Sequence, residues 1–71
     1  MDYVTVVSSN IAAIAYNEAG RVLGVRFTNG GEYQYRGVPI SIYHGFIRAA
    51  SKGHYFDTFV RKASYPFIRV R

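Results

Sequence analysis

The fold is decided by the stretch RVLGVRFTNGGEYQYR, which occupies residues 21–36. Apolar side chains alternate with small or polar ones in residues 21–27, and residues 32–36 alternate in the same way. A period of two is typical of half-buried β-strands. The Asn29-Gly30 pair between the two runs is a strong hairpin signal, because both residues tolerate the positive φ of tight turns. The stretch therefore predicts an antiparallel hairpin.

The hairpin has two plausible registers, and they place the tyrosines differently. In the first, residues 28–30 form a three-residue loop with Gly30 in the left-handed conformation. This register gives one continuous apolar face and puts a charge pair on the opposite face. Its central pairs are Leu23 with Tyr35, Val25 with Tyr33, and Arg26 with Glu32.

In the second register only residues 29–30 form the turn, and Tyr33 then lies opposite Arg26. That arrangement gathers the tyrosines and an arginine on one surface, but it turns Gln34 and Arg36 toward the side that helices would cover. Burying such polar groups without partners costs on the order of 1–3 kcal/mol each. We therefore favour the three-residue loop.

The rest of the chain predicts one strand before the hairpin and two short helices after it. Residues 11–16 form a short apolar run, and Gly37 and Pro39 end the sheet. Apolar residues then recur at helical spacing, with Ser51 as the cap of a second helix that Pro66 ends. The expected apolar stripes are Ile40, Tyr43, Ile47 and Ala50 on the first helix, and Tyr55, Phe56, Phe59 and Val60 on the second.

These elements predict an α+β fold: a three-stranded antiparallel β-meander followed by a two-helix hairpin packed on one face. Residues 67–71 alternate and could add a short C-terminal edge strand. We expect residues 1–71 to form a single domain with its core in residues 8–66. The expected core includes Leu23, Val25, Phe27, Ile47, Tyr55 and Phe59. Seven Tyr and five Phe supply the apolar area that so short a chain needs.

The charge of the chain points to an anionic partner. The formal net charge is +5, carried by seven Arg and two Lys against four acidic residues. A positive surface attracts nucleic acid, anionic lipid or an acidic protein, and the guanidinium group of Arg suits phosphate contacts and stacking. The alternative is a solvated basic shell with no partner.

The composition also indicates where the protein works. The chain has no cysteine, which fits a reducing compartment. Residues 1–3 lack the basic region of a secretory signal, and the longest apolar run, residues 11–16, is too short to span a bilayer. We expect a cytoplasmic protein that does not bind membranes.

The sequence offers little for catalysis or metal binding. His44 and His54 have no second ligand at metal spacing. No nucleophile elbow, phosphate loop or Ser/His/Asp arrangement is present. We therefore expect no catalytic residues, no metal and no cofactor, and we expect the protein not to be an enzyme.

Five short motifs resemble the KTSC domain, a family named for its place at the C-terminus of some lysyl-tRNA synthetases and also found as small stand-alone bacterial or phage proteins. The resemblance covers nearly all of residues 8–66, with Ala15 standing where many members have Gly. The motifs are Ser8-Ser9-Asn10-Ile11, Asn29-Gly30-Gly31, Tyr33-Gln34-Tyr35, Gly37-Val38-Pro39, and Ser51-Lys52-Gly53 before Tyr55-Phe56. The family has no established function, and its synthetase context implies RNA binding.

Charge and resemblance together predict a binding module for RNA or another nucleic acid. Tyr33 and Tyr35 are candidates for base stacking, although they could instead cover the core. Residues 51–53 are a candidate phosphate site, although they could be an ordinary helix cap. The candidate binding residues are Arg26, Tyr33, Tyr35, Arg36, Arg48, Lys52, Gly53, Arg61 and Lys62, with Arg69 and Arg71 extending the basic surface. The alternative function is a protein-interaction module that docks on an acidic surface of a larger complex.

Overall fold

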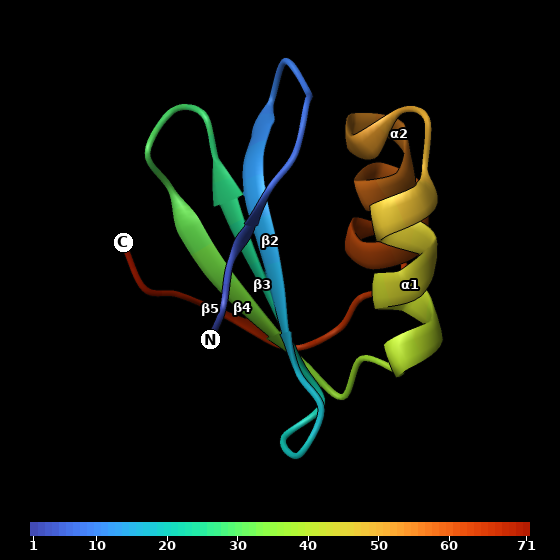
Figure 1. Ribbon diagram of the computed structural model, residues 1–71. Helices are drawn as coiled ribbons and strands as arrows, with labels where there is room; N and C mark the ends of the chain where they lie inside the picture. The colour runs from blue at the N-terminus through green and yellow to red at the C-terminus, as the bar shows by residue number, and fades with distance from the viewer.

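The computed structural model describes all 71 residues as a five-stranded antiparallel sheet with helices on one face (Figure 1). The strands lie side by side in chain order. They are β1 (Val4–Thr5), β2 (Ile11–Asn17), β3 (Val22–Phe27), β4 (Glu32–Arg36) and β5 (Phe67–Arg69). The helical part consists of α1 (Ile40–Arg48), α2 (Lys52–Phe56) and η1 (Asp57–Arg61), where η1 is a π-helix that continues α2.

The predicted α+β class and the C-terminal strand are confirmed, but four strands precede the helices rather than three. The additional strand, β1, pairs Val4 with Ile14 and Thr5 with Ala13. It has only two residues, both exposed, so it lacks the apolar alternation by which strands are recognised in sequence. None of the helices has the length and apolar character that a membrane span requires.

The hairpin of β3 and β4 has the predicted three-residue loop. Val25 pairs with Tyr33, Leu23 with Tyr35, and Arg26 with Glu32. The amide of Gly30 donates to the carbonyl oxygen of Phe27 at 3.0 Å, and Gly30 has a φ of +98°. The apolar side chains of both strands therefore lie on the face that the helices cover.

The core lies between this sheet face and the helices. Leu23 and Val25 are fully buried, as predicted, and Tyr55 and Phe27 pack against them. The core cluster consists of Ile11, Ile14, Leu23, Val25, Tyr35, Val38, Phe46 and Val60.

The prediction that Ile47 and Phe59 belong to the core is wrong, because both side chains are exposed. Phe46 is the buried residue of α1. On the second helix the π-helical turn, closed by a bond from the amide of Lys62 to the carbonyl of Asp57, adds a residue to the turn. It leaves Val60 as the buried residue of η1 and Phe59 in solvent.

The N-terminal segment covers part of the opposite sheet face, away from the helices. Tyr3 lies directly over Gly24, at the position that a Cβ atom of residue 24 would occupy. Its hydroxyl donates to Glu32 at 3.1 Å, and the guanidinium of Arg26 stacks 3.7 Å from the centre of its ring. The guanidinium group of Arg26 is therefore engaged by Tyr3 and Glu32, and Tyr3 anchors the N-terminal segment on β3 and β4.

Candidate functional site

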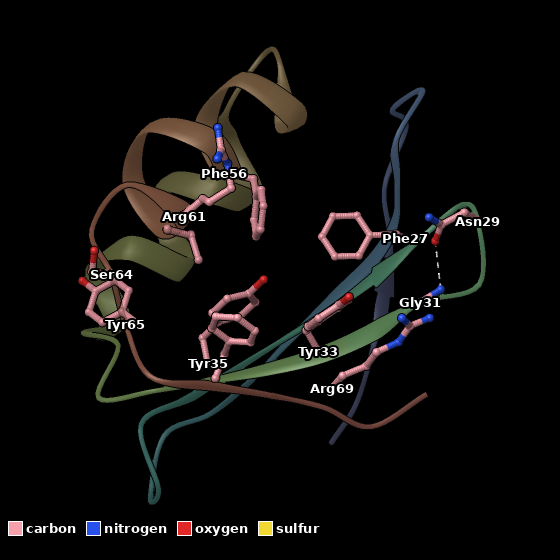
Figure 2. Close-up of a pocket in the computed structure, with 12 residues that line it drawn as sticks. Phe27, Asn29, Gly31, Tyr33, Tyr35, Phe56, Arg61, Ser64, Tyr65 and Arg69 are labelled. Carbon is pink, nitrogen blue, oxygen red and sulfur yellow. Dashed lines mark hydrogen bonds between the residues drawn. The ribbon is translucent and has the colours of Figure 1, made fainter.

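A groove of about 570 Å³ opens beside α2 and η1 on the helix-covered side of the sheet, over β4 and β5 (Figure 2). We call it the aromatic groove. Its main lining residues are Tyr33, Tyr35, Phe56, Phe67, Arg61 and Arg69. Its volume lies within the range typical of small-molecule sites.

The floor of the groove is formed by Tyr33 and Tyr35. Successive side chains of a strand point to opposite faces, so the spacing of two places both rings on the helix side of β4. Their centroids lie 6.4 Å apart with ring planes 25° from parallel. Tyr35 belongs to the buried core and Tyr33 is half-buried, so the rings cover the core and line the groove together. Burial raises the pKa of Tyr35 to about 12.

The walls are aromatic as well, and they come from three other elements. Phe56 of α2 contacts Tyr35 edge to face at 5.7 Å, and Phe27 of β3 contacts Phe56 in the same way at 5.3 Å. Phe67 of β5 lies 5.4 Å from Tyr35. Such tilted contacts between rings fix the geometry of the groove. Phe67 is 57 % exposed, so the groove opens to solvent along β5.

Two guanidinium groups lie at the rim of the groove, and only one of them is paired with a side-chain carboxylate. Arg61 donates to the carboxylate of Asp57 at 2.6 Å, and Lys62 lies 3.6 Å from the same carboxylate. The hydrogen bond from Arg61 holds the pKa of Asp57 below its usual range. Arg69 has no acidic side-chain partner. Its Nε donates to an oxygen of Arg71 at 2.9 Å, and its guanidinium carbon lies 5.6 Å from the centre of the Tyr33 ring.

A polar end of the groove is formed by the hairpin loop. The side-chain oxygen of Asn29 accepts a hydrogen bond from the amide of Gly31 at 2.9 Å, as Figure 2 shows. This bond leaves the amide nitrogen of Asn29 as a donor. Gly31 keeps the opening clear, because a Cβ atom there would lie 3.3 Å from the oxygen of Asn29 and 3.8 Å from Arg69.

The nine residues predicted to bind nucleic acid fall into three groups. The groove brings together Tyr33, Tyr35 and Arg61, with Lys62 adjacent to Arg61. The turn between α1 and α2 holds Arg48, Lys52 and Gly53. Arg26 and Arg36 lie on the opposite face of the sheet, since they alternate with the buried residues of β3 and β4.

The predicted phosphate segment, residues 51–53, has its polar groups engaged within the protein. The hydroxyl of Ser51 accepts from the amide of His54 at 3.2 Å, so Ser51 caps α2 as predicted. The ammonium group of Lys52 donates to the carbonyl of Ala49 after the end of α1. The segment faces residues 8–10 across a small polar notch, so two of the motifs named above meet in space.

Three groove residues, Phe56, Phe67 and Arg69, were not predicted to form the groove. Phe67 and Arg69 alternate along β5, which was expected as an edge strand. Their relevance depends on β5 lying beside β4, where Phe67 pairs with Tyr35 and Arg69 with Tyr33. The only signal in the sequence was the shared spacing of two in residues 33–35 and 67–69.

The structure contains no group of three or more His, Cys, Asp or Glu side chains placed to hold a metal ion. The functional groups of the groove are aromatic rings, guanidinium groups, an amide and hydroxyls. Such groups suit the binding of a flat, negatively charged ligand.

Comparisons with known proteins place the chain in one family. The family model of the KTSC domain matches residues 7–65. A protein of Tsukamurella paurometabola is 36 % identical over 54 residues, which cover 76 % of this chain and 81 % of that protein. The crystal structure of a KTSC domain protein from Yersinia pestis superposes with a TM-score of 0.92 at 34 % identity, covering 99 % of this chain and 97 % of that one. The chain belongs to the KTSC domain family.

Proposed function

We propose that this domain is a non-enzymatic binding module for single-stranded nucleic acid, with RNA as the expected ligand. The observation that carries the proposal is the aromatic groove with Arg69, which has no acidic side-chain partner, at its rim. Proteins that bind single strands combine aromatic rings, on which bases stack, with basic side chains that contact the backbone.

The distribution of charge supports an anionic ligand over a neutral one. Only Arg26, Arg61 and Lys62 of the nine basic side chains form ion pairs. The remaining arginines and Lys52 have no carboxylate partner, although Lys52 and Arg69 each donate to an oxygen of the chain. Each phosphate contact that such a side chain makes releases condensed counterions. We expect Arg48 and Lys52 to add phosphate contacts outside the groove. Arg36 lies on the opposite face of the sheet, and Arg61 must leave Asp57 before it can contact a phosphate.

A single strand fits the groove better than a duplex. Bases in a duplex are stacked on one another and present only their edges, so they cannot offer their faces to Phe67 and Tyr33. The groove is also narrow, because Phe56 of α2 faces the sheet across it (Figure 2). The cytoplasm, where single-stranded RNA is abundant, is the compartment that we propose.

The proposal is tested by fluorescence anisotropy with a labelled single-stranded RNA and a duplex of equal length. We expect the single strand to bind more tightly and its affinity to fall steeply with salt. Arg48→Ala should lower the slope of log affinity against log salt by about 0.7, since one phosphate contact is lost. Absence of binding to RNA and DNA at low salt would contradict the proposal and favour an acidic protein partner.

A further inference from the structure

We infer that the aromatic groove holds one unstacked base of the strand, and that Arg69 contacts the phosphate next to that base. This inference rests on the proposed function and deepens it. It predicts a ligand with an accessible base in a loop, a bulge or a free end. The case is built from the shape of the groove, the exposure of its rings and the position of Arg69.

The shape of the groove favours one base over a series of stacked bases. A platform for successive bases is a flat, open sheet surface, whereas here Phe56 faces Tyr35 from α2 and closes one side. Tyr65 and Ser64 line the groove as well. The space of about 570 Å³ has the size of a small-molecule site.

The exposure of the rings shows where the base would stack. Tyr35 is buried and Phe56 is half-buried, and both are held by their neighbours. Phe67 is the most exposed ring of the groove, and its ring lies 5.9 Å from that of Tyr33. A base entering from the open side therefore meets Phe67 and Tyr33 first. The free amide nitrogen of Asn29 supplies a hydrogen-bond donor for the edge of the base.

The position of Arg69 links the base to a phosphate. Arg69 and Phe67 are two residues apart on β5, so their side chains lie about 7 Å apart on the same face. One nucleotide spans this separation from its base to its phosphate. Arg61, the other guanidinium of the groove, is paired with the carboxylate of Asp57. Arg69 donates only its Nε, to an oxygen of Arg71, so its two terminal nitrogens make it the stronger candidate for an incoming phosphate.

The test uses two short oligomers with the same sugar–phosphate backbone, one carrying a single base at its centre and one carrying none. The base should increase the affinity of the wild-type domain by roughly 5- to 150-fold, the range of one stacking contact. Phe67→Leu should remove most of this increase. Phe59→Leu is the matched control, because Phe59 is an exposed ring outside the groove, and it should keep the increase.

A second pair of variants tests the role of Arg69. Arg69→Gln should weaken binding of the one-base oligomer more than binding of the oligomer without a base, because the phosphate next to the bound base is the one lost. Arg48→Gln, which removes an arginine at the end of α1 that has no acidic partner, should weaken both oligomers by the same factor. Amide NMR spectra of each variant should be recorded to check that it is folded.

The outcomes separate the two proposals. Equal, salt-sensitive binding of both oligomers by the wild-type domain would overturn the one-base inference and leave nucleic-acid binding intact. If the base increases the affinity of the Phe67→Leu variant as much as that of the wild type, the base does not stack on Phe67. That result would also overturn the inference. If neither oligomer binds at low salt, and an ordinary single-stranded RNA does not bind either, the proposed function itself is overturned.

Discussion

At the scale of single residues, the two phenylalanines Phe46 and Phe59 differ most from what the sequence suggests. Phe46 is completely buried, whereas Phe59 is 46 % exposed. Phe46→Ala should cost about 3–5 kcal/mol of unfolding free energy, close to the whole stability of so small a domain. Phe59→Ala should cost about 1 kcal/mol or less. Urea unfolding followed by circular dichroism measures both. Equal destabilisation by the two substitutions would show that the helix faces are assigned wrongly.

Glu32 should make the stability of the domain depend on pH in the acid range. A hydrogen bond from Arg26 holds the pKa of Glu32 below its ordinary value, and a second bond from Tyr3 adds to the effect. A carboxylate with a lowered pKa in the folded state stabilises the protein above its unfolded pKa, and the stabilisation is lost as pH falls through the folded pKa. Unfolding free energies measured from neutral to acid pH should therefore decline less for Glu32→Gln than for the wild type. Parallel curves for the two proteins would argue against this role.

The residue scale also shows which features can be predicted from a sequence. The hairpin register could be favoured from the sequence because the three-residue loop gives a continuous apolar face and pairs Arg26 with Glu32, whereas the alternative turns Gln34 and Arg36 toward the helices. The burial of Phe46 in place of Ile47 was not, because the apolar residues of α1 allow more than one face and only contact with the sheet selects between them.

At the scale of elements, the contact between α1 and α2 depends on Gly45. The hydroxyl of Tyr55 lies where a Cβ atom of residue 45 would be, and it donates to the carbonyl oxygen of Ile42 at 2.8 Å. In an exposed helix, Gly→Ala stabilises by about 1 kcal/mol. Here Gly45→Ala should instead destabilise the domain by about 1–3 kcal/mol, because the methyl group displaces Tyr55.

Thermal unfolding of a double-mutant cycle checks this prediction. Tyr55→Phe removes the hydroxyl that meets the new methyl group, so Gly45→Ala should cost less in the Tyr55→Phe background than in the wild type. An additive pair, or a stabilising Gly45→Ala, would show that the helices are not packed as described.

Elements also explain why the aromatic groove was only partly predicted. Its floor follows from the alternation of β4, which a sequence displays. Its open side requires that β5 return to the edge beside β4, and its wall requires that α2 direct Phe56 toward the sheet. Both are long-range relations between segments, and no local pattern of residues specifies them.

At the scale of the whole molecule, the two faces of the sheet differ: one face holds the N-terminal segment, and the other holds the core and the candidate site. The face away from the helices is fastened by Tyr3, Arg26 and Glu32, which satisfy one another. The helix face holds the core and, at the β5 edge, the aromatic groove with Arg69. The domain has a net charge of +5, and the proposal uses this charge to attract anionic ligands. The account therefore predicts binding at one localised place on a generally attractive surface.

The most direct test of the central claim is an NMR titration of the domain with a short single-stranded RNA at low salt, followed through the carbon–proton signals of the aromatic rings. The account predicts that the signals of Tyr33, Phe56 and Phe67 shift, while those of Tyr16 and Tyr43, which stack on each other outside the groove, stay in place. Shifts of Tyr16 and Tyr43 with unmoved groove signals, or no shifts at all, would contradict it.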